Sequence, residues 1–173
     1  MKILKNYSYN LSYQLLAIIL PIITTPYVTR VFTSSQLGSY GYHNSIVAYF
    51  LLAATLGIST YATKEISAHT IDRSKVFWEI YMIQGIASAL ALVLYLIFCW
   101  TIPGMQNSIA YILSISLVSK GLDISWLFQG VEDFKKITIR NMTVRIIGVC
   151  SIFLFVKQES DLYLYVFLLV FYE

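Results

Sequence analysis

Forty consecutive residues of this 173-residue chain, from position 80 to position 119, contain no aspartate, glutamate, lysine or arginine. A single helix of that length would extend about 60 Å, roughly twice the thickness of the hydrocarbon core of a bilayer. The segment must therefore fold back on itself. Pro103 and Gly104, followed by Gln106 and Asn107, are residue types that favour a turn and can face water. The run predicts two membrane-spanning helices joined by a very short turn.

The composition of the whole chain supports the same interpretation. Hydrophobic residues make up 58% of the sequence, aromatic residues 16% and charged residues 12%, and the mean hydropathy is +0.70. Ordinary soluble domains contain about 25% charged residues. A soluble fold would need a larger core than a chain of this length can enclose. The predicted fold class is therefore all-α, a polytopic transmembrane helical bundle.

Five complete spans and the start of a sixth can be placed from the distribution of apolar residues. The complete spans are predicted at residues 9–32, 44–62, 77–102, 108–129 and 137–156. A sixth begins at residue 162 and would extend about 16 Å before residue 173, half of a membrane. Because a helix that stops there leaves its last carbonyls without partners, we interpret the sequence as a truncated piece of a longer protein.

The positions of lysine and arginine predict the orientation, because cytoplasmic connections carry an excess of both. Arg30 and Lys157 lie on one side of the predicted spans, and Lys120 and Arg145 lie within spans. Eight of the twelve basic residues lie on the other side: Lys2, Lys5, Lys64, Arg73, Lys75, Lys135, Lys136 and Arg140. The N-terminus is therefore predicted to be cytoplasmic.

The first span contains two prolines, Pro21 and Pro26. Each removes a backbone hydrogen bond, so the helix is expected to bend or break there, with Thr24 and Thr25 available to satisfy the released carbonyls. A bent helix can rock during gating. Arg30 lies one turn after Pro26, near the outer end of the span. It is either a surface anchor or a cation at a cavity wall that holds a phosphate.

Three further ionisable residues lie within predicted spans. Lys120 and Asp123 are three residues apart and are expected on one helical face, either as a structural pair or with Asp123 in a proton or ion-coupling step. Arg145 lies about 12 Å into the fifth span, too deep to be explained by snorkelling. It is expected to face protein or water inside the bundle.

Several function classes have no support in the sequence. The basic residues form no run that could follow a phosphate backbone, so nucleic acid is not an expected partner. A nucleotide-binding P-loop and a Ser-His-Asp arrangement are missing, and His43 and His69 have no carboxylate or cysteine cluster for a metal. We therefore expect no catalytic residues, no metal site and no cofactor.

Four segments resemble the polysaccharide biosynthesis flippases, which transport O-antigen and capsule repeat units. The most specific is DISWLFQGVEDFKKITIRN at residues 123–141, which carries tryptophan, glutamine, glycine, acidic and Arg-Asn positions in order. The others are LPIITTPYVTRVF at residues 20–32, YF at 49–50 with LGI at 56–58, and FWEI at 77–80. The resemblance covers nearly the whole chain. It places the sequence in the multidrug/oligosaccharidyl-lipid/polysaccharide exporter superfamily.

This resemblance implies an alternating-access transporter of twelve to fourteen helices in two pseudo-symmetric bundles. The five spans and part of a sixth in this sequence would be the N-terminal bundle, with the second bundle absent. Its substrate would be an oligosaccharide on undecaprenyl pyrophosphate, turned across the cytoplasmic membrane for surface polysaccharide synthesis. Membrane lipids and polysaccharide polymerase machinery are the implied partners. By position, Arg30 would be the cavity cation, with Asp123, Arg145 and Lys120 as further lining residues. Pro21 and Pro26 would serve the gate.

Two rival functions remain open from the sequence. One is a cation-coupled multidrug antiporter of the same superfamily, which would export drugs without affecting surface glycan. The other is a non-transporting membrane scaffold or remnant, suggested by the sixth span that stops halfway. Neither rival is an enzyme.

Overall fold

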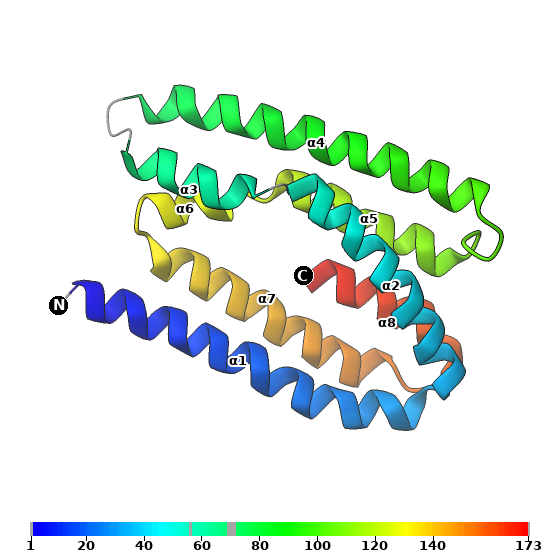
Figure 1. Cartoon of the computed structure of the whole chain (residues 1–173). Coiled ribbons are helices and arrows are strands. Elements are labelled where there is room, and N and C mark those ends of the chain that lie inside the picture. Colours follow the sequence, from blue (N-terminus) through cyan, green and yellow to red (C-terminus); the bar gives the residue numbers. More distant parts are fainter. Residues whose placement is uncertain (1, 56, 69–71, 173) are drawn as a thin grey trace. The chain divides into compact units, whose positions relative to one another are not determined.

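The computed structural model describes residues 2–55, 57–68 and 72–172, and every regular element in these ranges is helical (Figure 1). The elements are α1 (Lys2–Val31), α2 (Ser34–Thr55), α3 (Ile58–Ala68), α4 (Arg73–Thr101), α5 (Ser108–Leu122), α6 (Ser125–Gly130), α7 (Phe134–Phe155), the 3-10 turn η1 (Glu159–Asp161) and α8 (Leu162–Tyr172). Five helical segments are long and apolar enough to cross a membrane. The predicted all-α polytopic fold is confirmed.

The chain divides into two units, each with its own contacts. Unit 1 combines the chain up to His43 with the part that begins at Phe134, and unit 2 is Asn44–Asp133. In unit 1, α7 packs against both α1 and α8. The ring of Tyr27 in α1 lies 4.7 Å from that of Phe153, and its hydroxyl donates to the carbonyl of Val156 at 2.6 Å. These contacts fix α1 against the last turn of α7.

Helix α1 passes through both prolines without interruption. Of the two outcomes expected there, a bend or a break, the structure excludes the break. The hydroxyl of Thr24 donates to the carbonyl of Leu20 at 3.0 Å. Each proline leaves the carbonyl four residues earlier in the chain without its backbone donor. The carbonyl of Leu20 is not one of these two carbonyls. The expected role of Thr24 in satisfying released carbonyls is therefore wrong.

The two chain reversals of unit 1 are held by capping bonds. Gln36 accepts at Oε1 from the backbone N–H of Thr33 at 3.0 Å, while the hydroxyl of Thr33 accepts from the N–H of Gln36 at 3.3 Å. This reciprocal pair starts α2 at Ser34. The amide of Gln36 also donates to the carbonyl of Glu159 at 3.0 Å. The α1–α2 and α7–α8 reversals therefore lie at the same end of unit 1.

The α7–α8 reversal should respond to pH through Asp161. Its carboxylate accepts from the backbone N–H groups of Lys157 at 3.0 Å and Gln158 at 2.9 Å. These two bonds lower the pKa of Asp161, and the bond from Lys157 has the larger effect. A carboxyl whose folded pKa lies below its unfolded value stabilises the fold above the unfolded pKa. That contribution disappears as the pH falls through the folded pKa.

We therefore expect the hydrogen-exchange protection of the Lys157 and Gln158 amides to fall at acidic pH. In Asp161→Asn the protection should be low throughout the same pH range, because the neutral amide is a weaker acceptor. Hydrogen exchange followed by mass spectrometry measures both proteins. Equal, pH-independent protection in the two would show that the carboxylate does not hold this turn.

In unit 2, α4 packs against α5 and α3, and α3 packs against α6. A buried cluster at the α3–α6 end consists of Ala62, Ile66, Ile80 and Trp126. At the other end of α4 the buried hydroxyl of Tyr95 donates to the carbonyl of Ala110 at 3.0 Å. The ends of α3 and α6 are tied because the hydroxyl of Ser67 donates to the carbonyl of Gly130 at 3.2 Å.

The helix bounds differ most from the predicted span bounds at the second and fourth spans. Helix α2 begins ten residues before the predicted start at 44, because the Thr33–Gln36 cap begins it earlier. The same span is divided between α2 and α3, where Gly57 adopts φ +74. The fourth predicted span is also divided, between α5 and α6. Leu56 and Glu173 belong to predicted segments but lie outside the described residues.

Candidate functional site

The interruption of the fourth span is the most polar feature of unit 2. Helix α5 ends at Leu122 and α6 begins at Ser125, with Asp123 in an extended conformation at φ −70 and ψ 115. The carboxylate of Asp123 accepts from the backbone N–H of Ser125 at 2.9 Å and from the Ser125 hydroxyl. A helix that ends inside a membrane segment leaves carbonyls that lipid cannot satisfy. This interruption therefore needs partners from the protein.

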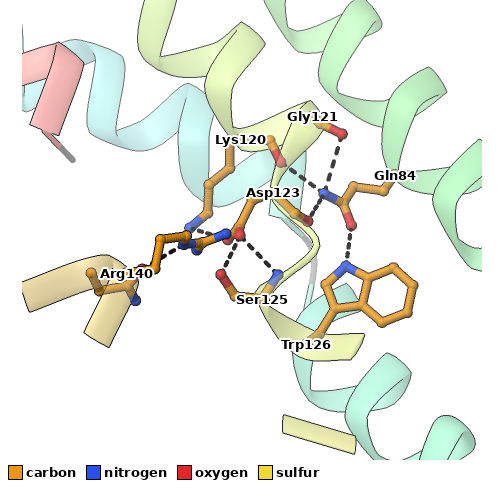
Figure 2. A network of polar contacts seen from close by, with 8 residues as sticks. Gln84, Lys120, Gly121, Asp123, Ser125, Trp126 and Arg140 are labelled. Carbon is orange, nitrogen blue, oxygen red and sulfur yellow. Dashed lines mark hydrogen bonds and ion pairs between the residues drawn. The ribbon is translucent and has the colours of Figure 1, made fainter. Parts of the chain in front are cut away.

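Gln84 of α4 supplies those partners (Figure 2). Its amide nitrogen donates to the carbonyls of Lys120 at 2.8 Å, Asp123 at 2.9 Å and Gly121 at 3.3 Å. Its amide oxygen accepts from the indole N–H of Trp126 at 2.8 Å. The Gln84 side chain is 7% exposed. One buried amide thus joins α4 to the end of α5 and to α6.

Sequence reasoning did not identify Gln84, although a signal was present. Between residues 80 and 105 of the charge-free run it is the one Asn or Gln. A buried polar side chain is retained at low cost when its hydrogen bonds are satisfied. A lone amide within a predicted span therefore indicates that backbone groups nearby need a hydrogen-bond partner.

Close packing of α4 against α5 brings the amide within reach. A Cβ built on Gly121 would lie 2.7 Å from the Oγ and 2.9 Å from the Cβ of Ser88. The buried Ser88 hydroxyl donates to the carbonyl of Leu117, one turn before Gly121. The absence of a side chain at Gly121 therefore allows the two helices to approach at the level of Gln84.

Lys120 and Asp123 form the expected ion pair, with Lys120 Nζ 3.8 Å from Asp123 Oδ2. Their side chains are 47% and 32% exposed. The two side chains meet as their spacing predicts, although Asp123 is the C-cap of α5 and its carboxylate also accepts from the backbone N–H of Ser125, the first residue of α6. An aspartate can leave the helix here because its side chain accepts hydrogen bonds from the backbone N–H and the hydroxyl of Ser125, two residues later.

A small hollow of about 20 Å³ adjoins this pair. That volume suits a single water molecule. Its lining comes from five helices, α2 to α6, and from the α5–α6 interruption: Ala54, Thr55, Ile58, Ser59, Gln84, Ser88, Lys120, Asp123 and Trp126. Gln84, Ser88, Lys120 and Asp123 give this hollow polar groups within the spans.

The two arginines predicted as site residues belong to unit 1. The guanidinium carbon of Arg145 lies 5.4 Å from the centre of the Tyr13 ring on α1, a cation–π contact. The expectation that Arg145 faces protein is confirmed. Arg30 is exposed in the last turn of α1, where a cation interacts favourably with the helix dipole. Because Tyr13 and Arg30 are about 25 Å apart along α1, the two arginines do not form one cluster.

Comparison with known proteins identifies a family and relatives of this chain. The model of the family described as polysaccharide biosynthesis protein matches residues 3–172. A protein of Escherichia coli (strain K12) named "Putative O-antigen transporter" is 25% identical over 149 residues, which is 83% of this chain and 36% of that protein. A protein of the same name from Shigella dysenteriae is 23% identical over 145 residues, 82% of this chain and 37% of that protein.

The chain thus spans just over a third of the length of these curated relatives. No solved structure matches it. The five apolar helices and the relatives together indicate a multi-pass membrane protein. Since the family match extends over almost every residue, the chain belongs to the polysaccharide biosynthesis protein family.

Proposed function

We propose that the protein flips an oligosaccharide repeat unit, linked to undecaprenyl pyrophosphate, across the cytoplasmic membrane for surface polysaccharide synthesis. The observation that carries this proposal is the family match over residues 3–172, together with relatives named as O-antigen transporters. Polysaccharide polymerase machinery would receive the flipped unit. Transport of this kind needs no catalytic residues of its own.

The chemistry of such a substrate suits the charged residues of the spans. A pyrophosphate and a sugar chain are strongly disfavoured in hydrocarbon, so a flippase must offer them polar groups during crossing. Arg30, Lys120 and Arg145 are cations within or at the end of apolar helices, and arginine holds phosphate through its planar fork. In this proposal each of them is a candidate contact for the anionic headgroup.

The proposed orientation places the N-terminus in the cytoplasm. Most basic residues then lie on the cytoplasmic side. Two hydrogen bonds support the alternation of the helices. The bond between Gln36 and Glu159 joins the α1–α2 and α7–α8 reversals, which are both assigned to the outer side. The bond between Ser67 and Gly130 joins the ends of α3 and α6, which are both assigned to the inner side. Each bond therefore agrees with the side assigned to the residues that it joins.

We also propose that the chain forms the N-terminal bundle of a two-bundle transporter. The share of the relatives that it matches, just over a third, supports this assignment. The sugar chain would pass between this bundle and a second one. Pro21 and Pro26 in α1 would provide the flexibility for opening, because each removes one backbone hydrogen bond from the helix.

The proposal predicts that Arg30→Ala lowers surface glycan in cells that lack their own repeat-unit flippase and depend on this protein. Loss of one charge-assisted bond to phosphate corresponds to about a tenfold fall in export. Arg30→Lys should retain part of the activity. Lys157→Ala, which removes an exposed cation assigned to the same side but outside the spans, is the matched control.

Surface glycan is measured by gel electrophoresis of extracted polysaccharide, with protein level in the membrane measured in parallel. Unchanged glycan in Arg30→Ala at equal protein level would remove Arg30 from the transport path. Export of drugs instead of any effect on glycan would favour a multidrug antiporter.

A further inference from the structure

Helix α1 is the least buried of the five segments that could span a membrane. Buried residues make up 6% of its apolar window, against 18% or 28% in each of the other four. Within α1, residues 11–27 are all partly or largely exposed. Val28, near the C-terminal end, and Phe32, just beyond it, are each 4% exposed. The N-terminal half of α1 is therefore held by less apolar packing than its C-terminal end.

Side-chain contacts fix the C-terminal end of α1. The ring of Phe32 lies 5.3 Å from that of Tyr165 in α8. Tyr27 is attached to the end of α7 by the ring contact and the hydrogen bond described above. Pro21 lies between this fixed end and Tyr13, and it removes one backbone hydrogen bond from the helix. The part of α1 before Pro21 can therefore bend relative to the fixed end.

Tyr13 connects the N-terminal half of α1 to α7 through a cation. The guanidinium carbon of Arg145 lies over its ring, 5.4 Å from the ring centre. A cation within a membrane segment needs a partner, because a charge is costly in hydrocarbon. Within the described residues the Arg145 side chain has no hydrogen bond or ion pair. The Tyr13 ring is thus the electrostatic partner that the structure gives to this cation.

The contact with the ring leaves the hydrogen-bond donors of Arg145 unused. A guanidinium carries several N–H donors in a planar fork, and its attraction to a ring face depends on charge rather than on those donors. Arg145 is partly exposed. Phosphate and other oxyanions bind a guanidinium through paired N–H bonds. Arg145 is therefore complementary to an oxyanion.

An oxyanion and the Tyr13 ring compete for the charge of Arg145. The ring attracts the guanidinium because the face of the ring is negative. A phosphate that pairs with the guanidinium neutralises its charge and is itself repelled by the ring face. By linkage, the factor by which the ring contact lowers the affinity for the anion is also the factor by which the anion weakens the ring contact.

We infer that the contact between Tyr13 and Arg145 is a latch that holds the N-terminal half of α1 against α7, and that an oxyanion bound to Arg145 releases it. The identity of the anion rests on the proposed function, which supplies the phosphate headgroup of a lipid. Movement of α1 would then follow the arrival of the headgroup. The fixed end at Tyr27 would stay in place during this movement.

Distances between spin labels test the latch in the full chain, held in phosphatidylcholine nanodiscs after both native cysteines have been replaced. Labels at Leu15 and Ile146 report the N-terminal half of α1 against α7. Labels at Ile23 and Leu154 report the fixed end. All four of these side chains are exposed. Double electron–electron resonance gives the distance distribution of each pair.

The ring contact is weakened without a change of shape by placing ring-fluorinated phenylalanine at position 13, because fluorine withdraws the negative charge of the ring face. Compared with Tyr13→Phe, the population with a longer distance between positions 15 and 146 should rise about fivefold. The pair at 23 and 154 should not change. The same residue at Tyr163, an exposed ring of α8, is the matched control. Unchanged distances at the first pair, or equal changes at both pairs, would overturn the inference.

The anion is tested with farnesyl pyrophosphate, an isoprenyl pyrophosphate, and with farnesol, the same chain without the charge. Farnesyl pyrophosphate should lengthen the first distance in the wild type, and farnesol should not. The fluorinated variant should bind farnesyl pyrophosphate about fivefold more tightly than Tyr13→Phe. Tighter binding by Tyr13→Phe, or an equal response in Arg145→Gln, would overturn the competition. Release by phosphatidylglycerol alone would support the latch and assign the anion to the membrane phospholipid.

The latch and the proposed function fail in different ways. If the protein is a flippase without this latch, the wild-type chain restores glycan export and ring fluorination changes neither distance. If the latch exists in a protein that is not a flippase, the distances respond while the wild-type chain does not restore glycan export. Glycan export is therefore measured in cells alongside the distances.

Discussion

Replacing Gln84 with leucine is expected to lower the stability of unit 2 by about 3 kcal/mol or more, because a buried polar group left without a partner costs about 1–3 kcal/mol. The substitution removes the donor to the carbonyls of Lys120, Gly121 and Asp123 and the acceptor of the Trp126 indole. Within a membrane segment water does not replace these bonds. Thermal unfolding in detergent micelles measures the loss.

Gln106→Leu is the matched control for this substitution. The amide of Gln106 makes an exposed hydrogen bond to the carbonyl of Trp100 at 3.0 Å, so its loss should cost less than about 1 kcal/mol. A double-mutant cycle with Trp126→Phe should give a coupling energy between Gln84 and Trp126. Equal unfolding temperatures for Gln84→Leu and Gln106→Leu would contradict the role of Gln84 at the helix interruption.

Substitution of Gly121 by alanine should also destabilise the protein, by about 1–3 kcal/mol, as overpacking of a close interface does. The added Cβ would lie 2.9 Å from the Cβ of Ser88, which rotation of the Ser88 hydroxyl cannot relieve. Helices α4 and α5 would have to separate, and the Gln84 bonds to the α5 end would lengthen. Thermal unfolding and intrinsic fluorescence of Trp126 report both effects.

Gly85→Ala in α4 is expected to have the opposite effect on stability. A Cβ at Gly85 meets no atom within 4 Å, so alanine should stabilise α4 by about 0.5–1 kcal/mol. In the Gly121→Ala background, Ser88→Gly should cost less than it does in the wild type, because it removes both close atoms. If Gly121→Ala unfolds like Gly85→Ala, the close approach at Ser88 is not needed.

The spans could be predicted from the sequence because membranes impose a simple rule on long apolar segments. The charge-free run from 80 to 119 required two helices. Most of α4 and most of α5 lie within this run. The turn at Pro103 and Gly104 was placed correctly, and Gly104 adopts φ +91. Element length and hydrophobicity therefore determined most of the fold.

Breaks inside spans could not be predicted in the same way. Hydropathy does not distinguish one helix from two collinear helices, so the interruption after Leu122 was missed. It depends on Gln84, which lies 39 residues from Asp123 in the sequence and hydrogen-bonds to its carbonyl. A long-range partner of this kind is not visible in local periodicity.

The candidate site was predicted in part. The Lys120–Asp123 pair was expected because their spacing and the cost of a charge in a membrane require a partner. The contact of Arg145 with protein was expected for the same reason. The particular partner of Arg145, Tyr13 in α1, was not predicted because the two residues lie far apart in the sequence. The cavity roles of Arg30 and Arg145 remain predictions.

Translocation of a lipid-linked oligosaccharide in everted membrane vesicles is the decisive measurement for the proposed function. Substrate added to the outer, cytoplasmic face should become inaccessible to a sugar-cleaving enzyme outside the vesicles, at a rate that depends on this protein. The rate should fall about tenfold in Arg30→Ala, by the energy of one bond to phosphate, and stay unchanged in Lys157→Ala. Equal rates in vesicles with and without the protein would contradict the account.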